Sequence, residues 1–179
     1  CPTVHEAVHK AIAVILFKLE GQVIRRHPEY DMDGRLLLDK IQWKEKTVQS
    51  GGEIYPLKTI QFPTIDPADP YALSPQEREI MDGLAECFRQ SVRLHEHVSF
   101  LYAVGNLYKC FNQNLLFHGC IPMNEDGSFT KVKVGGEWVS GKALMDAFEK
   151  VARQAYFSRN EEGHQEYCDA MYYLWCGRN

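Results

Sequence analysis

Histidines are the residues of this chain best suited to chemistry, and His118 has the most informative surroundings. The apolar run from Leu115 to Phe117 precedes it, which is typical of a short buried strand. Gly119 follows and permits a sharp change of backbone direction, and Pro122 then prevents further strand pairing through its missing N–H. The pattern predicts a strand that presents one imidazole at its carboxyl end, where ligands bind in α/β sheets. Imidazole is a common ligand of divalent first-row metals. The structural alternative is a core histidine at a strand end.

A second histidine pattern lies near the start of the chain. Residues 5–9, HEAVH, match the His-Glu-x-x-His pattern of zinc peptidases, in which two histidines share one helical face and the glutamate acts as base. However, Ile12 stands where the metzincin pattern has a glycine, and Ile15 stands where it has a third histidine. We therefore interpret this segment as a solvated helix face and keep a zinc peptidase as the weaker hypothesis.

The remaining candidate ligands are poorly spaced for a shared metal ion. His95 and His97 stand two residues apart, so their side chains diverge on a helix. Asp66 and Asp69 lie in the proline-rich stretch 59–75, where Asp-Pro steps are typical of turns. The sequence predicts no metal cluster from these residues alone.

Length and composition narrow the class of protein. A chain of 179 residues predicts one domain, or one domain and a piece of another. The net charge of −4 argues against a nucleic-acid-binding surface, which needs clustered Lys and Arg. No apolar run approaches the length of a membrane span, and no secretory signal is evident. None of the six cysteines forms a Cys-x-x-Cys pair, which argues against a zinc knuckle. Without a secretory signal, reduced thiols in a cytoplasmic protein are expected. The first residue, Cys1, suggests a piece excised from a longer polypeptide.

Periodicity and capping signals predict a mixed α+β fold. Thr3 with Glu6, and Ser74 with Glu77, have the spacing of helix-capping boxes. A stripe of apolar residues along the second helix predicts a buried face; it comprises Ile80, Met81, Leu84, Cys87, Phe88, Val92 and Leu94. Helices are predicted over 1–24, 74–104 and 140–157, with a helical or helix-to-strand segment over 166–175. Hairpins are predicted from strands 41–48 with 53–58, 107–111 with 115–120, and 130–134 with 137–139.

Several segments together resemble class III fructose-1,6-bisphosphatases. Residues 115–122, LLFHGCIP, followed by NEDGSF at 124–129, look like a segment that those enzymes carry. In the wider calcineurin-like metallophosphoesterases the similar stretch reads His-Gly-Gly, and its histidine binds one of two catalytic metals. Cys120 replaces the second glycine, as in the class III variant. Further resembling segments, in the family's order, are HKAI at 9–12, FKLEGQ at 17–22, RLLLDK at 35–40, PYAL at 70–73, GKAL at 141–144 and YLWCG at 173–177.

The resemblance implies a division of the chain and a reaction for its parent protein. Residues 1–104 look like the helix-rich insertion with a β-hairpin that is specific to class III, and 105–179 look like part of a metallophosphoesterase β-sandwich with flanking helices. The parent would hydrolyse fructose 1,6-bisphosphate to fructose 6-phosphate and phosphate, a gluconeogenic step, using two divalent ions, with Mn²⁺ as the expected metal. It would bind a small sugar bisphosphate, neither nucleic acid nor membrane, and a homo-oligomer is possible.

The resemblance also assigns roles to single residues. His118 would be a terminal metal ligand, since an imidazole nitrogen binds one ion. Arg178 is a candidate for contacting a substrate phosphate, with a surface arginine as the alternative. The family's other motifs (Asp-x-His, Gly-Asp-x-x-Asp-Arg-Gly and Gly-Asn-His-Asp) do not occur here. We therefore assign no catalytic residue in this fragment and expect the isolated chain to be inactive.

Two further hypotheses concern the helical part of the chain. If residues 1–104 form a lid that confers sugar specificity, Arg25, Arg26 and Arg35 are its candidate contacts. Alternatively, the chain is a non-enzymatic helical interaction module that binds a partner. A gene that encodes only these residues would favour that module. A reading frame that continues beyond them and encodes the family motifs absent here would favour the bisphosphatase.

Overall fold

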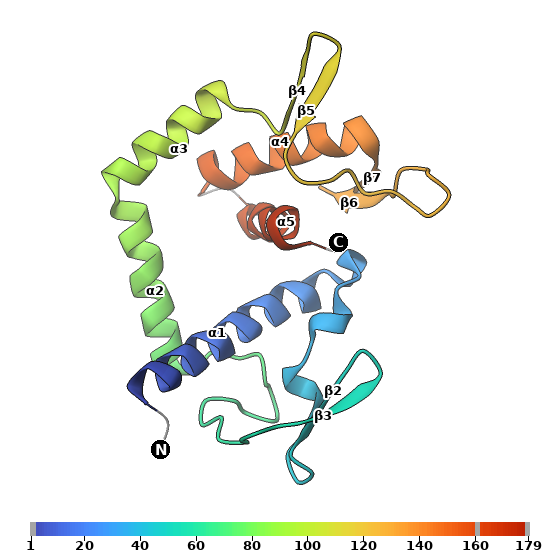
Figure 1. The fold of residues 1–179 in the computed structure, drawn as a ribbon. Helices are drawn as coiled ribbons and strands as arrows, with labels where there is room; N and C mark the ends of the chain where they lie inside the picture. Colours follow the sequence, from blue (N-terminus) through green and yellow to red (C-terminus); the bar gives the residue numbers. More distant parts are fainter. Residues whose placement is uncertain (1–2, 160–161, 178–179) are drawn as a thin grey trace. The chain divides into compact units, whose positions relative to one another are not determined.

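The structure is a computed structural model that describes residues 3–159 and 162–177 (Figure 1). The chain divides into two compact units, Cys1–Gln90 and Ser91–Asn179. Each unit has its own cluster of buried apolar side chains, and each is described separately below.

The first unit opens with the long helix α1, Val4–Arg26. Its start is the predicted capping box: the Thr3 hydroxyl accepts the Glu6 N–H at 3.3 Å, and the Glu6 carboxylate accepts the Thr3 N–H at 2.6 Å. Two arginines in the last turn complement the helix dipole. Pro28 then opens a 3₁₀ turn, Pro28–Tyr30, so both ends of the helix lie close to where the sequence predicts them.

A small antiparallel sheet follows two more 3₁₀ turns, Asp33–Arg35 and Leu38–Lys40. Its strands are β1 (Ile41–Gln42), β2 (Thr47–Ser50) and β3 (Glu53–Pro56), in the order β1-β2-β3. The β2–β3 hairpin forms around Gly51 and Gly52, whose φ angles are 58° and 85°. The predicted strand over 41–48 is two strands, because a turn over residues 43–46 divides it.

The first unit ends with α2, Pro75–Gln90, which also begins with its predicted capping box. The Ser74 N–H donates to Glu77 at 2.8 Å, and the Glu77 N–H donates to the Ser74 hydroxyl at 3.2 Å. The apolar core of this unit gathers side chains from α1, the first sheet and the loop that leads to α2; it comprises Val14, Leu38, Ile41, Ile65 and Tyr71.

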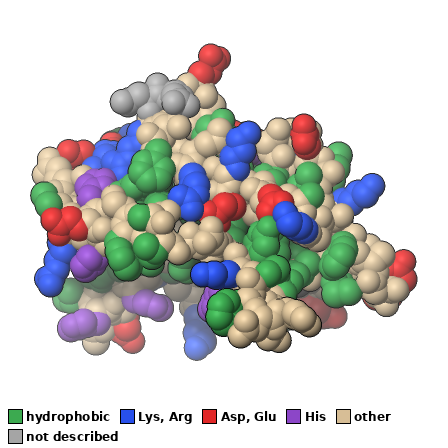
Figure 2. All heavy atoms as spheres, turned by 90° about the horizontal axis from the view of Figure 1, so that it is seen from above, with side chains coloured by type: hydrophobic (Ala, Val, Ile, Leu, Met, Phe, Trp, Pro, Cys, Tyr) green, Lys and Arg blue, Asp and Glu red, His purple; other side chains and the backbone are tan. Residues whose placement is uncertain are grey.

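The prediction of a buried stripe along α2 is wrong for this chain. Ile80 and Phe88 are more than half exposed, and Leu84 is nearly half exposed. The periodicity is real, because α2 is a regular helix, but within the described residues the stripe has little to pack against. Apolar side chains are open on the face that Figure 2 shows.

The second unit begins with α3, Val92–Val104, where the sequence predicts one helix continuing from residue 74. The break lies at Ser91, whose φ of −73° and ψ of 98° are extended and whose hydroxyl accepts the Leu94 N–H at 3.3 Å. Ser91 is therefore the N-cap of a new helix. Gly105 ends α3, as predicted.

Two hairpins and two helices complete the second unit. The strands are β4 (Tyr108–Phe111) paired with β5 (Asn114–Phe117), and β6 (Val132–Val134) paired with β7 (Glu137–Val139). The helices α4 (Gly141–Phe157) and α5 (His164–Cys176) pack on each other. Both hairpins are confirmed, and the last predicted segment is helical. Its preceding polar break includes residues 160–161, which lie outside the described residues. The core comprises Val132, Val134, Leu144, Phe148, Val151 and Ala170.

The α+β class is confirmed: helices alternate with small antiparallel sheets in both units. The unit boundary falls before α3. The predicted boundary at 104/105, between an insertion and an enzyme core, concerns the parent protein and stays a prediction. Within the described parts of the chain, no helix combines the length and the apolar character needed to cross a bilayer.

Candidate functional site

His118 follows directly after the last residue of β5, at the carboxyl end of that strand, as predicted. The turn between β4 and β5 is Asn112–Gln113, and both residues have positive φ (48° and 63°), as in the type I′ turns that favour tight hairpins. Gly119 has a φ of 89°, which a glycine adopts without strain. The predicted change of backbone direction after the imidazole is confirmed.

The base of this hairpin is tied to α4. The Leu107 N–H donates to the Glu149 carboxylate at 2.8 Å, and the Tyr108 hydroxyl donates to Asp146 at 2.7 Å. Beyond His118, the Ser128 N–H and hydroxyl both donate to Asp126, at 2.9 and 2.6 Å, in a compact loop. The segment before His118 is thus held against α4, and the loop after it is ordered by its own hydrogen bonds.

The expected burial of the β5 strand is wrong for this chain. Leu115, Leu116 and Phe117 are 45%, 53% and 43% exposed, and His118 is exposed. The cause is the sheet itself: β5 pairs with β4 alone, so this ribbon has neither a second neighbour strand nor a cover on both faces. An apolar run in an uncovered ribbon indicates that polypeptide outside these residues is needed to bury it.

The other histidine candidates have local roles or are exposed. The Glu6 carboxylate of the HEAVH segment accepts from both the N–H and the hydroxyl of Thr3, so it points back toward the helix start. His95 Nδ1 lies 2.6 Å from the Tyr156 hydroxyl, whereas His97 is exposed, so these two diverge as predicted. In the described parts of the chain, no three His, Cys, Asp or Glu side chains gather as a metal site.

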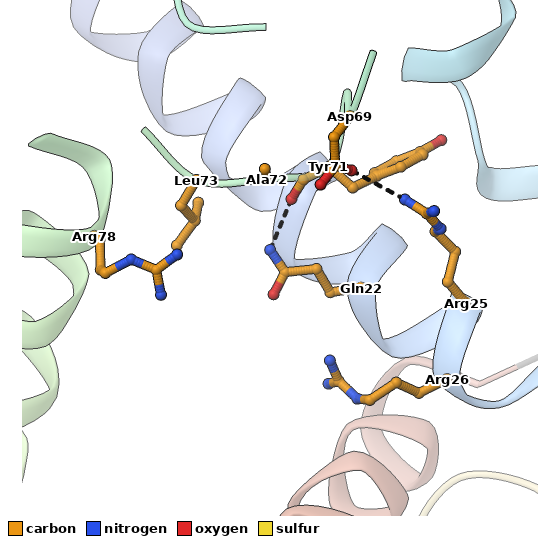
Figure 3. Close-up of a pocket in the computed structure, with 8 residues that line it drawn as sticks. All are labelled: Gln22, Arg25, Arg26, Asp69, Tyr71, Ala72, Leu73 and Arg78. Atoms are coloured by element: carbon orange, nitrogen blue, oxygen red, sulfur yellow. Dashed lines mark hydrogen bonds and ion pairs between the residues drawn. The ribbon is translucent and has the colours of Figure 1, made fainter. Parts of the chain in front are cut away.

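A cavity of about 430 Å³ lies in the first unit, between α1, α2 and the loop that joins the sheet to α2 (Figure 3). We call it the arginine cavity, because three arginines line it. Its lining residues are Gln22, Arg25, Arg26, Asp69, Tyr71, Ala72, Leu73 and Arg78. In Figure 3, Gln22, Arg25 and Arg26 come from α1, and Arg78 comes from α2. Asp69 to Leu73 lie in the loop.

Tyr71 fixes the loop of the arginine cavity against α1. Its ring lies against Gly21, where a Cβ atom would overlap two ring carbons. Its hydroxyl donates to Asp39 at 2.7 Å, and its backbone carbonyl accepts from Gln22 at 2.7 Å. Burial, together with that contact to Asp39, raises the pKa of Tyr71, so the phenol stays protonated at physiological pH.

A buried ion pair joins α1 to α2 beside this cavity. The Lys18 ammonium is fully buried, lies 2.7 Å from Glu77, and also donates to the Thr64 carbonyl. Burial alone would raise the pKa of Glu77, but hydrogen bonds from Lys18, Thr64 and the Ser74 N–H outweigh it and lower that pKa. The Glu77 carboxylate therefore stays charged at neutral pH, and its contact with Lys18 joins the two helices.

The structure separates the predicted arginines. Arg25 and Arg26 both line the arginine cavity, whereas Arg35 pairs with Glu20 at 3.3 Å and is not part of the lining. Arg78 was missed by the sequence analysis, since nothing local in α2 marks it; only folding brings it opposite α1. Arg178, the other predicted phosphate contact, lies outside the described residues.

Comparison with known proteins decides the family. Residues 2–179 match the sequence model of the family described as Firmicute fructose-1,6-bisphosphatase. The chain belongs to this family. The family resemblance identified from the sequence is therefore confirmed.

Relatives within the family are close in sequence and much longer. A class 3 fructose-1,6-bisphosphatase from Clostridium beijerinckii is 52% identical over 170 residues, which cover 95% of this chain and 26% of that protein. Those from Clostridium novyi and Clostridioides difficile are 46% and 48% identical, each over 96% of this chain and 26% of the relative. The chain thus spans about a quarter of the length of these relatives. No solved structure matches the chain.

The described residues do not by themselves fit a metal pair. His118 can supply one nitrogen, but among the described residues no group of three or more His, Cys, Asp or Glu side chains gathers that could hold a metal ion. Two-metal sites require several convergent ligands, including groups that span both ions. Any such site must draw its other ligands from outside these residues.

Proposed function

We propose that this chain is part of a longer enzyme that hydrolyses fructose 1,6-bisphosphate to fructose 6-phosphate and phosphate, by two-metal phosphomonoester hydrolysis in gluconeogenesis. The observation that carries the proposal is the match of nearly the whole chain to about a quarter of three class 3 fructose-1,6-bisphosphatases. The uncovered β4–β5 ribbon supports it, because its apolar strand needs additional chain to become buried.

In this proposal His118 supplies a terminal ligand to one divalent ion, which we expect to be Mn²⁺. Its place at a strand end, before a glycine with positive φ and after a hairpin tied to α4, suits a fixed ligand. Its exposure within this chain leaves the imidazole accessible to groups from the rest of the parent. This chain then positions one ligand and contributes no acid or base of its own.

The test of His118 uses the full-length parent enzyme. His118→Ala should lower the amount of bound metal and reduce turnover by more than roughly 10–100-fold. That range is the usual effect of changing a residue that only supports a metal ligand by a hydrogen bond. Metal content by elemental analysis, the rate of phosphate release and the circular dichroism spectrum are the readouts. His97→Ala, an exposed histidine of α3, is the matched control. A His118→Ala enzyme with normal metal content and rate would contradict the assignment.

The isolated chain should release no phosphate from fructose 1,6-bisphosphate, with or without added Mn²⁺. The reason is the ligand set: one imidazole cannot hold two ions. Metal-dependent phosphate release by the purified chain would overturn this part of the proposal.

We place the parent in the cytoplasm, which is compatible with the free thiols of Cys87, Cys110, Cys120, Cys168 and Cys176.

A non-enzymatic interaction module is the second candidate, and the exposed apolar stripe of α2 is compatible with it. Both candidates predict that this stripe is covered, by the remainder of the parent in one case and by a separate partner in the other. The reading frame around the coding segment separates them. A frame that continues into the missing metal-binding motifs supports the enzyme, whereas a stop codon directly after residue 179 supports the module.

A further inference from the structure

We propose that the arginine cavity is a binding site for the phosphate group of a phosphorylated small molecule, with Arg78 as its principal contact. This inference goes beyond the proposed function, because it concerns a site that does not include His118 and lies in the other compact unit of the chain. It would stand even if His118 had no role in catalysis.

The charge of the lining favours an anion. Three guanidinium groups and one carboxylate line the arginine cavity, so the lining carries a net charge of about +2 at neutral pH. This concentration of positive charge occurs in a chain whose net charge is −4. A local field opposite to that of the whole molecule draws anions to one place.

Arg78 is the arginine with the fewest competing contacts. Its guanidinium makes no hydrogen bond or ion pair with the residues that the structure describes, and Figure 3 shows it extended toward Leu73 at the cavity. Arg25, by contrast, is 3.3 Å from Asp69 and lies over the Tyr71 ring. Because a guanidinium presents several N–H donors in a fixed fork, it suits the oxygens of a phosphate.

The walls of the arginine cavity are fixed before any ligand binds. The Lys18–Glu77 pair ties α1 to α2, and the Gln22 amide holds the loop by the Tyr71 carbonyl. The contact between Gly21 and the Tyr71 ring admits no side chain between helix and loop. Preorganised walls lower the entropy cost of binding, because the groups that contact the ligand are already in place.

The size of the arginine cavity suits a small organic phosphate. Its volume of about 430 Å³ falls in the range of small-molecule sites, roughly 300–1,000 Å³. The amide of Gln22 offers a polar group beside the arginines, which a hydroxylated ligand could use. Two sources share this chemistry: the non-reacting phosphate of a sugar bisphosphate, and a separate phosphorylated effector.

The experiment measures the binding of inorganic phosphate to the full-length parent by calorimetry. Arg26→Ala and Arg78→Ala should each weaken binding about tenfold or more, as expected for lost hydrogen bonds to a charged group. Arg78→Lys should recover part of the affinity, because it keeps the charge without the fork. The matched control is Arg89→Ala, on the same helix but paired with Glu86 outside the cavity. Wild-type affinity in both alanine variants, or no binding by the wild type, overturns the proposal.

Asp69→Asn provides a test of opposite sign. It removes the only carboxylate of the lining and releases Arg25 from its ion pair. Phosphate affinity should rise by roughly two- to fivefold, the worth of an exposed ion pair. Circular dichroism checks that the variant is folded, since a damaged fold would lower the affinity. If the folded variant binds phosphate with unchanged or lower affinity, the proposal is contradicted.

Kinetics of the same variants separate the two sources of phosphate. If the arginine cavity receives the substrate, Arg78→Ala should raise the KM for fructose 1,6-bisphosphate and leave kcat nearly unchanged. If it receives an effector, the KM should stay unchanged while the effect of added inorganic phosphate on the rate becomes smaller than in the wild type, leaving only product inhibition. Calorimetry needs no turnover, so it tests the cavity even if the parent does not hydrolyse this sugar.

Discussion

At Gly21 the Tyr71 ring of the loop before α2 packs directly against α1. A methyl group there would overlap the Tyr71 ring, and overpacking of this kind costs about 1–3 kcal/mol. We therefore predict that Gly21→Ala lowers the midpoint of chemical denaturation. Gly83→Ala is the control: Gly83 lies on an exposed face of α2 with open space around it, so alanine should stabilise by about 0.5–1 kcal/mol. Equal effects at the two sites would contradict the packing argument.

Removing one partner of the Lys18–Glu77 pair should be costly, because the other charge stays buried. Lys18→Met is expected to destabilise the chain by about 3–5 kcal/mol, and Lys18→Met combined with Glu77→Gln by less. Denaturant titration of the two variants measures both effects. If the double variant is less stable than the single one, the unpaired carboxylate is not the cause.

The same pair predicts how stability depends on pH. The pKa of Glu77 is lower in the folded chain than its ordinary value of 4.5. Its contribution is therefore complete above pH 4.5 and is lost as the pH falls through the folded pKa. The stability difference between wild type and Lys18→Met should shrink between pH 7 and about pH 3. A difference that stays constant with pH would show that the loss is one of packing.

Residues with local partners were predictable, and residues with distant partners were not. Thr3 with Glu6, and Ser74 with Glu77, are three positions apart, so the sequence alone reveals the capping box. Lys18 and Glu77 are 59 positions apart, and nothing in either neighbourhood marks a buried ion pair. Arg78 was missed for the same reason, whereas the strand-end position of His118 follows from its immediate neighbours.

At the scale of the elements, the β4–β5 hairpin turns on a residue with a side chain and a positive φ. Gln113 has a φ of 63°, which costs a residue with a side chain more than it costs glycine. Gln113→Gly should stabilise the hairpin, by about 0.5–1 kcal/mol, and slow the hydrogen exchange of the Asn114 to Phe117 amides. Gln113→Val should act in the opposite direction. Unchanged exchange in both variants would show that the turn does not limit hairpin stability.

Element types follow from periodicity, but element ends and burial depend on more than that. The helix predicted over 74–104 is broken at Ser91 because a serine hydroxyl can cap a new helix inside a continuous apolar pattern. The apolar stripe of α2 and the run in β5 were predicted to be buried, and both are largely exposed. Apolar periodicity identifies which face must be covered, but it does not tell whether the cover belongs to the same stretch of chain.

At the scale of the whole molecule, exposed apolar side chains follow two helices of the first unit. Val4, Val8 and Ile12 recur every fourth residue on α1, and Ile80 and Phe88 lie on α2, each more than half exposed. We predict that the isolated chain self-associates with rising concentration. Sedimentation velocity of wild type against Val8→Gln/Ile12→Gln measures this effect, and the double variant should remain smaller. Equal behaviour of the two would place the association elsewhere.

The complete burial of Lys18 gives the chain an internal reporter of its own folding. Amine-reactive reagents modify exposed lysines quickly, but this ammonium is enclosed and hydrogen-bonded to Thr64 and Glu77. Its labelling, read by mass spectrometry, can proceed only when the contact between α1 and α2 opens. Lys109, an exposed lysine of β4 in the second unit, serves as the reference for the labelling rate of an accessible amine. The ratio of the two labelling rates would follow local opening of the first unit in mixtures as crude as a cell extract.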